Sequence, residues 1–243
     1  METQNQKKEN QSLVIHYYKL RQLIGVMGIA LPVLLIIGSH LNHCGHIETS
    51  ISNFFYTNLR DVFVVTLSAV SLFLFTYKGY DKRDKIAINI AGVLGLIVAF
   101  FPTTFQNDIC LPCYQLLPSD SSIIQSYKVI PCPHSAYIGD IHLGCASLFF
   151  FTLAYISIFL FTKTRKTEKP THRKLIRNRF YRVCGCIMVG CILLLVPYFL
   201  SDSISSHLAE FKPVFWMETI ALWAFGISWL IKGQVVLKDK PEI

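Results

Sequence analysis

The sequence has little charge, and acids are especially scarce. Asp, Glu, Lys and Arg make up 16% of its 243 residues, whereas about 25% is usual for a soluble domain. Hydrophobic residues make up 52%, and the mean hydropathy is +0.44. This composition excludes an ordinary soluble domain and predicts a membrane protein. The net charge of +8 would suggest nucleic acid for a soluble protein, but here the bases lie between apolar runs, so we expect no nucleic-acid partner.

Two further absences narrow the prediction. The first apolar run ends at Gly38, Ser39 and His40 without a small-x-small cleavage site, so we interpret it as an uncleaved first span rather than a signal peptide. No motif in the chain indicates a particular reaction, and we expect no cofactor.

The strongest positive signal is the stretch from Lys163 to Arg182, which carries nine Lys or Arg and one acid, Glu168. Short loops this basic stay on the cytoplasmic side of a membrane. With this loop inside, the six-span arrangement places 20 Lys or Arg on the cytoplasmic side and three outside, at Arg60, Lys128 and Lys212. This asymmetry predicts the orientation of every other segment.

The predicted fold is all-α, an integral membrane bundle of six transmembrane helices with both termini cytoplasmic. Each apolar run is about as long as the roughly 17 to 25 residues that a span needs. The spans occupy residues 22–39, 59–77, 86–103, 137–162, 183–200 and 214–231 of a transmembrane domain over 22–232. The outer loops are 40–58, 104–136 and 201–213, and the cytoplasmic tails are 1–21, with a disordered start, and 233–243. In the third span, Ala91, Gly95 and Ala99 recur four residues apart, which predicts close helix packing.

Polar residues gather at the outer ends of these spans. They are Glu48, Ser50, Ser52, Arg60, Asp61, Asp140, His142 and Glu218. Polar groups at membrane depth are costly, which makes them candidates for function. We expect an outward-facing pocket formed by spans two, four and six, in which Arg60 holds an anionic head group. The structural alternative is that these residues pair with one another, cap helices and keep the outer rim wet.

The preferred function is binding or handling of a lipid or other amphiphile without catalysis, with Glu48, Asp61 and Glu218 ordering the polar rim. The first alternative is a membrane-embedded hydrolase, possibly metal-dependent, that uses His142 with Asp140, Asp61 or Glu218. Because Asp140 and His142 are two apart, they point about 200° away from each other on a helix. The second alternative is a small channel or transporter, although the inner halves of the spans are nearly free of charge.

The cysteines divide into two groups. Four lie in outer loops, where an oxidising compartment favours two disulfides with three possible pairings: Cys44, Cys110, Cys113 and Cys132. A metal site is the weaker alternative, since histidines lie near these cysteines in the sequence: His40, His43, His46 and His134. The other four cysteines lie in or near the helices, where we expect them to pack as small apolar residues.

Several phrases carry a resemblance, namely SISNFFYTNLRDVFV, YKGYD, VAFFPT, DIHLGCASLFFFTLAY and FGISWLIKG. They look like those of uncharacterised bacterial multi-span proteins, which implies the bacterial inner (cytoplasmic) membrane. The chain is more distantly similar to the DRAM and FRAG type of six-span proteins, in which a polar Ser-containing segment follows the first span. That likeness implies that the protein handles membrane lipids, which would be its partners. The alkaline ceramidase and adiponectin-receptor type resembles the chain only in its Ser, Asp and His residues near helix ends.

Overall fold

The computed structural model describes residues 2–41, 47–77, 81–104, 136–164 and 171–235, and within them it contains helices and no strands. The predicted all-helical class is confirmed. The long helices are α1 (Glu2–Leu41), α2 (Arg60–Thr76), α3 (Lys82–Phe100), α5 (Ala136–Tyr155), α6 (His172–Leu200) and α8 (Pro213–Lys232). The short ones are η1 (Ser52–Tyr56), η3 (Ile156–Leu160), α7 (Asp202–Leu208) and η4 (Ala209–Phe211).

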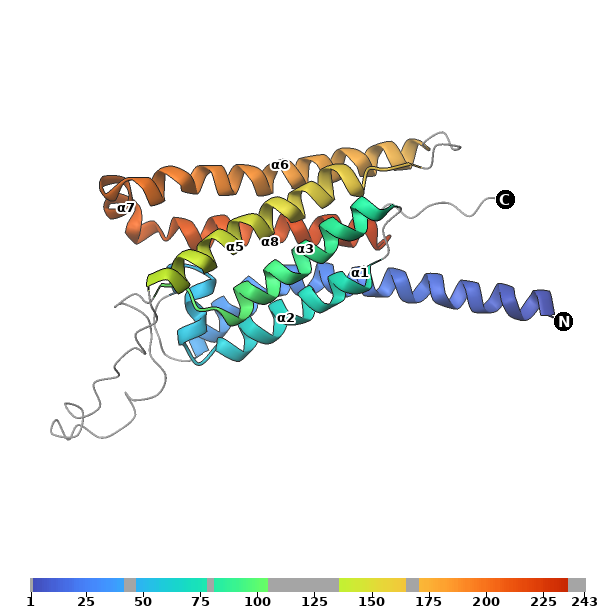
Figure 1. Ribbon diagram of the computed structural model, residues 1–243, viewed down its shortest axis with the longest axis horizontal. Coiled ribbons are helices and arrows are strands. Elements are labelled where there is room, and N and C mark those ends of the chain that lie inside the picture. The colour runs from blue at the N-terminus through green and yellow to red at the C-terminus, as the bar shows by residue number, and fades with distance from the viewer. Residues whose placement is uncertain (1, 42–46, 78–80, 105–135, 165–170, 236–243) are drawn as a thin grey trace.

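The six long helices run along a common direction and form a closed ring in chain order (Figure 1). Each packs on the next, from α1 to α2, α3, α5, α6 and α8, and α8 returns to pack on α1. Successive helices point in opposite directions, so the ring has two ends, each built from alternating helix starts and helix stops.

Close approach of α1 and α8 depends on glycine. A Cβ atom on Gly25 would lie 2.8 Å from the carbonyl oxygen of Gly226, and one on Gly226 would lie 2.6 Å from the carbonyl oxygen of Gly25. Helices in lipid associate through such small-residue contacts because apolar burial gives them little driving force there. These two glycines therefore close the ring.

The predicted small-residue seam of α3 is confirmed. Ala91 and Ala99 are fully buried, and a Cβ atom on Gly95 would collide with Ser71 of α2 and press on Phe149 of α5. The seam thus faces both neighbours of α3, and its small side chains let three helices meet at one level.

Among the described residues, four helices are long and apolar enough to cross a membrane: His16–Leu41, Tyr137–Leu160, His172–Leu200 and Pro213–Lys232. The protein is therefore membrane-embedded by the length and composition of its helices. The α2 helix, with 17 residues, is about 25 Å long against a hydrocarbon core of about 30 Å. The α3 helix has 19 residues but begins with the charged run Lys82–Lys85.

Two segments predicted as tail and loop are helical. The α1 helix begins at Glu2, so the disordered start predicted for residues 1–21 is wrong over the described residues. The α6 helix begins at His172, eleven residues before the predicted span at 183. Its N-terminus is capped by the Thr171 hydroxyl, which accepts from the backbone N–H of Lys174 at 3.2 Å. The charge of these residues predicted a loop. Instead, the Thr171 cap starts the helix at His172, and packing against other helices stabilises its first turns.

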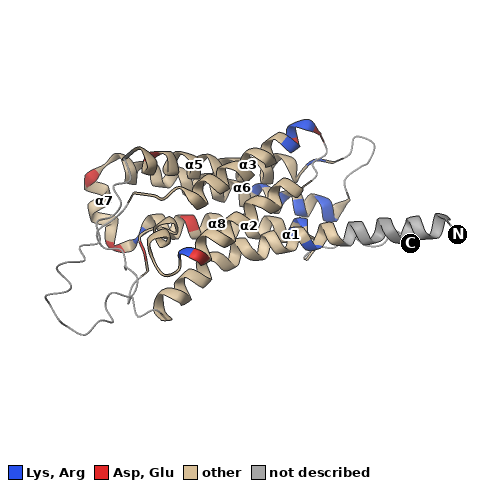
Figure 2. Cartoon of the chain, turned by 60° about the horizontal axis from the view of Figure 1, so that its bottom comes forward, with Lys and Arg blue, Asp and Glu red and all other residues tan. Residues whose placement is uncertain are grey.

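Charge distinguishes the two ends of the ring (Figure 2). Bases gather where α3 and α6 begin and α8 ends, which we name the basic end. The opposite end, where α1 and α3 end and α5 and α8 begin, contains a cavity and is named the cavity end.

The π-helical turn η3 lies toward the basic end, where its Ser157 hydroxyl donates to the Tyr181 carbonyl of α6 at 2.8 Å.

Candidate functional site at the cavity end

The segment between α1 and α2 folds back into the cavity end. Sequence analysis placed it in an outer loop over 40–58, but four consecutive residues of it are buried, with 1% to 6% of each exposed. They are Ile51, Ser52, Asn53 and Phe54. The short 3₁₀ helix η1 begins within this stretch. Because these residues are buried, the segment lies inside the ring and does not merely cover its end.

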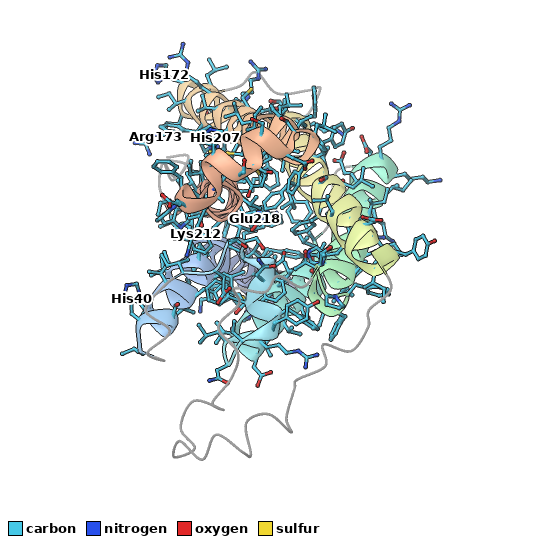
Figure 3. All side chains as sticks on the ribbon, turned by 90° about the vertical axis from the view of Figure 1, so that its left-hand side faces the viewer. His40, His172, Arg173, His207, Lys212 and Glu218 are labelled. Atoms are coloured by element: carbon cyan, nitrogen blue, oxygen red, sulfur yellow. The ribbon has the colours of Figure 1, made fainter. Side chains whose placement is uncertain are left out.

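Two hydrogen bonds attach this segment to α8. The backbone N–H of Phe215, at the start of α8, donates to the carbonyl of Thr49 at 3.0 Å. The backbone N–H of Ile51 donates to Oε2 of Glu218 at 2.7 Å. Figure 3, viewed from the cavity end, places Glu218 near the middle of the ring and His40 at its periphery. The Glu218 carboxylate therefore satisfies a backbone donor that the inserted segment brings into the bundle.

A second connection runs from the segment through His142 of α5 to the end of α3. Nδ1 of His142 lies 2.6 Å from the carbonyl oxygen of Phe101, and Nε2 lies 2.8 Å from Oγ of Ser52. A carbonyl can only accept, so Nδ1 carries the proton. In the neutral ring Nε2 then accepts from the Ser52 hydroxyl. This hydroxyl–imidazole–carbonyl chain has the order of a nucleophile, a base and an orienting group.

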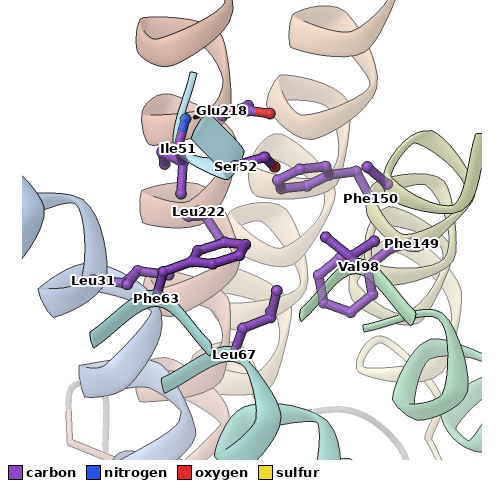
Figure 4. Close-up of a pocket in the computed structure, with 11 residues that line it drawn as sticks. Leu31, Ile51, Ser52, Phe63, Leu67, Val98, Phe149, Phe150, Glu218 and Leu222 are labelled. Atoms are coloured by element: carbon purple, nitrogen blue, oxygen red, sulfur yellow. Dashed lines mark hydrogen bonds between the residues drawn. The ribbon is translucent and has the colours of Figure 1, made fainter. Parts of the chain in front are cut away.

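A small cavity lies beside these groups (Figure 4). The centre of a water molecule can occupy about 30 Å³ of it, enough for about two waters. Ser52 and Glu218 provide its polar side chains, at the edge nearest the inserted segment. The remaining lining is apolar: Leu31, Ile51, Phe63, Leu67, Val98, Ala146, Phe149, Phe150 and Leu222. Five long helices, α1, α2, α3, α5 and α8, supply this wall, in place of the three spans that were predicted.

The structure brings some of the predicted site residues together and separates others. Ser52 and Glu218 line the cavity, His142 contacts Ser52, and Glu48 and Ser50 are buried in the same segment as Ser52. In contrast, three predicted members are exposed and do not line the cavity: Arg60, Asp61 and Asp140. As their spacing predicted, Asp140 and His142 point in different directions, one exposed and the other 3% exposed.

Arg60 has an aromatic neighbour. Its guanidinium carbon lies 4.3 Å from the centre of the Phe55 ring, a cation–π contact at the start of α2. Tyr56, next to Phe55, donates its hydroxyl to the Thr103 carbonyl at 2.5 Å. Burial raises the pKa of the Tyr56 phenol above its ordinary value, so this hydroxyl remains a donor across the physiological range.

The predicted disulfides and most of the alternative metal ligands lie outside the described residues. They are Cys44, Cys110, Cys113, Cys132, His43, His46 and His134. His40 is described, and its Nδ1 lies 2.9 Å from the carbonyl of Ile36 in its own helix. Within the described ranges, no group of three or more His, Cys, Asp or Glu side chains could hold a metal ion.

Comparisons with known proteins do not decide the function. No family model, curated protein or solved structure matches this chain.

Several groups at this end were not predicted from the sequence. The Phe101 carbonyl and the Ile51 N–H are backbone groups that every residue carries, so no residue type marks them. Phe149 and Phe150 line the cavity, but their apolar side chains resemble any others in a span. Ser52, the partner of His142, was among the predicted residues, but its contact with His142 was not, because it joins positions 90 apart.

Proposed function

We propose that the protein binds a membrane amphiphile at the cavity end, with a small polar group in the cavity and the chain along the apolar helix faces. The observation that carries this proposal is the cavity itself, an apolar wall with a carboxylate and a hydroxyl at one edge. Binding sites for small molecules combine apolar walls with a few placed polar groups in this way.

The chemistry of the two polar groups suggests which head group fits. Glu218 offers carboxylate oxygens and Ser52 a hydroxyl, a pair that suits a hydrogen-bond donor such as a hydroxyl or an amine. The cavity holds about two waters, so only the tip of a head group enters it. Arg60 remains a candidate for holding an anionic head group at the outer rim, outside the cavity.

The membrane arrangement belongs to the same proposal. All six long helices cross the inner membrane of a bacterium, with the basic end and both termini in the cytoplasm. The clustering of bases at one end supports this orientation. The α2 and α3 helices fit because their neighbours in the ring cover them on two sides.

The test is a thermal-stability titration of the detergent-purified protein with dodecylamine and with dodecyl sulfate. We expect dodecylamine to stabilise the wild type and to lose about tenfold in affinity in Glu218→Gln, since hydrogen bonds to charged groups contribute about 1.5–3 kcal/mol. Asp140→Asn is the matched control, because it removes an exposed carboxylate at the same end. Equal weakening in both variants would refute the cavity as the binding place.

The same titration tests Arg60 separately. Stabilisation by dodecyl sulfate that is lost in Arg60→Gln and kept in Glu218→Gln would place an anionic head group at the rim, as the sequence predicted. Loss in neither variant would remove Arg60 from the binding surface.

A second candidate function is supported by one observation, the Ser52–His142–Phe101 chain. With His142 as base, Ser52 could attack an ester or amide carbonyl, which would make the protein a membrane-embedded hydrolase. Both ring nitrogens of His142 are engaged, which favours a base over a metal ligand. A fluorophosphonate probe should label the wild type covalently, Ser52→Ala should not be labelled, and His142→Gln should be labelled at least about 100-fold more slowly. Unchanged labelling in Ser52→Ala would exclude this candidate.

A further inference from the structure

The short helices α7 and η4 connect two membrane-spanning helices at the cavity end. They join α6 to α8, both of which are long and apolar enough to cross a membrane. Because α6 ends and α8 begins at the same end of the ring, the connection lies at the level where both spans meet the membrane surface (Figure 1). Neither short helix contains a residue that the described parts of the chain bury.

One face of this connection is apolar. Ile204, Leu208 and Phe211 recur four and then three residues apart, which is the spacing of one helix face. Their side chains are 38%, 39% and 69% exposed within the described structure. Large apolar side chains that gather on one exposed face mark a surface for contact with a membrane or with another protein.

A separate face of the same connection is polar. It carries Ser203, Ser206, His207 and Glu210, all of which are exposed. Nδ1 of His207 lies 2.7 Å from the carbonyl oxygen of Ser203, and the Ser206 hydroxyl donates to the same carbonyl at 3.0 Å. A segment that has one apolar and one polar face, and little hydrophobicity overall, lies flat at the boundary between lipid and water.

Lipid-facing surfaces adjoin this apolar face on both sides. Phe199 and Leu200, at the end of α6, are 48% and 81% exposed, and Trp216, in the first turn of α8, is 41% exposed. Exposed apolar side chains on a helix that crosses a membrane face lipid, and Trp is enriched where such helices meet the head groups. The apolar face of α7 and η4 therefore continues a surface that lipid already covers.

We propose that α7 and η4 lie in the lipid interface at the cavity end, with Ile204, Leu208 and Phe211 among the acyl chains and the polar face toward water. The partner of this face is thus the membrane surface. Glu218 follows the start of α8 at Pro213 by five residues, so it lies about 8 Å along the helix from this level. The lipid contact does not require the cavity to bind an amphiphile.

The experiment places the photoreactive residue p-benzoylphenylalanine in the full chain, in place of either Leu208 or Ser206. The protein is reconstituted into dioleoyl phosphatidylcholine vesicles and illuminated, and mass spectrometry measures the lipid adducts. Ser206 is the matched control, because it is exposed in the same helix but lies on the polar face. We expect at least about fivefold more lipid adduct from position 208, since the apolar face of an interfacial helix lies about 5–10 Å into the acyl boundary.

Phe211 provides a second position if the variant at Leu208 does not fold, and the same excess over Ser206 is expected there. Equal lipid adducts from the two faces would refute the proposal, as would their absence from both apolar positions in folded protein. An adduct between two copies of the chain would assign the face to a dimer instead. An adduct with another segment of the same chain would show that this segment covers the face, and would also overturn the proposal.

Discussion

The two ends of the ring are ordered by different interactions. At the cavity end, a polar segment enters the bundle and its groups are satisfied one by one through Glu218, His142 and backbone carbonyls. At the basic end, a packed aromatic cluster carries cations on its surface. The comparison shows that membrane helices can bury polar chemistry by hydrogen bonding it or by placing it on aromatic rings. The first arrangement leaves a small cavity beside the hydrogen-bonded groups.

The largest effect is expected from truncating the aromatic cluster. Trp229 is 1% exposed and packs with Tyr77, Phe161 and Phe225 at ring distances of 5.1 to 5.9 Å. Trp229→Ala should lower the free energy of unfolding by about 3 kcal/mol or more, because the lost contacts leave a void. Denaturant titration in micelles measures this change, with the exposed Trp216→Ala as control. A loss no greater than that of the control would show that the aromatic cluster does not stabilise the basic end.

The hydrogen-bonded end should respond less to one substitution but should show coupling. His142→Phe keeps the ring volume and removes two hydrogen bonds, so the free energy of unfolding should fall by about 2 kcal/mol. In a double-mutant cycle with Ser52→Ala, the two losses should be non-additive by about 1 kcal/mol. Additive losses would show that the Ser52–His142 bond contributes nothing of its own.

The cap of α6 should have a smaller effect at the basic end. Thr171→Ala removes the hydroxyl that accepts from the Lys174 N–H, and the expected loss in free energy of unfolding is about 1 kcal/mol. Thr171→Ser retains this hydroxyl and should stay near the wild type. If both variants lose the same amount, side-chain capping is not what starts the helix at that position.

The smallest effect is expected from the exposed ion pair beside the basic end. The hydrogen bond from Lys163, followed by that from the Asp84 N–H, lowers the pKa of Asp81 to about 2. A lowered pKa means that the stabilisation is present above the ordinary Asp pKa and is lost as the pH falls toward 2. Asp81→Asn retains the helix cap and removes the charge, so its melting temperature should lie slightly below that of the wild type at pH 7 and meet it near pH 2. A difference that does not change with pH would remove the ion pair from the explanation.

Much of the fold could be predicted because its signals are local. Apolar runs located every long helix, and the α8 helix begins and ends within one residue of its predicted span. The α6 helix was placed too late because its first turns are basic, and charge was taken as the sign of a loop. Its buried residues Arg177 and Tyr181 explain the difference, since contacts with other helices stabilise a segment whose composition alone does not.

The residue types of the candidate site could be predicted from the sequence, but which of these residues lie together could be predicted only in part. Ser52, His142 and Glu218 stood out as polar residues near helix ends. His142 contacts Ser52, and Ser52 and Glu218 line the same cavity. Arg60, Asp61 and Asp140 had the same sequence signal but face outward, because the direction of a side chain depends on the rotation of its helix in the ring. That rotation is determined by packing partners far away in the sequence, such as the Gly25–Gly226 contact.

By itself, the sequence determined that this protein is helical, embedded in a membrane and basic at alternate helix ends, because apolar length and charge spacing are local properties of the chain. Only the tertiary structure decided that the ring closes, that the 47–59 segment enters it, and that Arg21 and Lys232 lie against one aromatic cluster. These features depend on contacts between residues far apart in the sequence, such as Gly25 with Gly226 and Ile51 with Glu218, for which no local pattern exists.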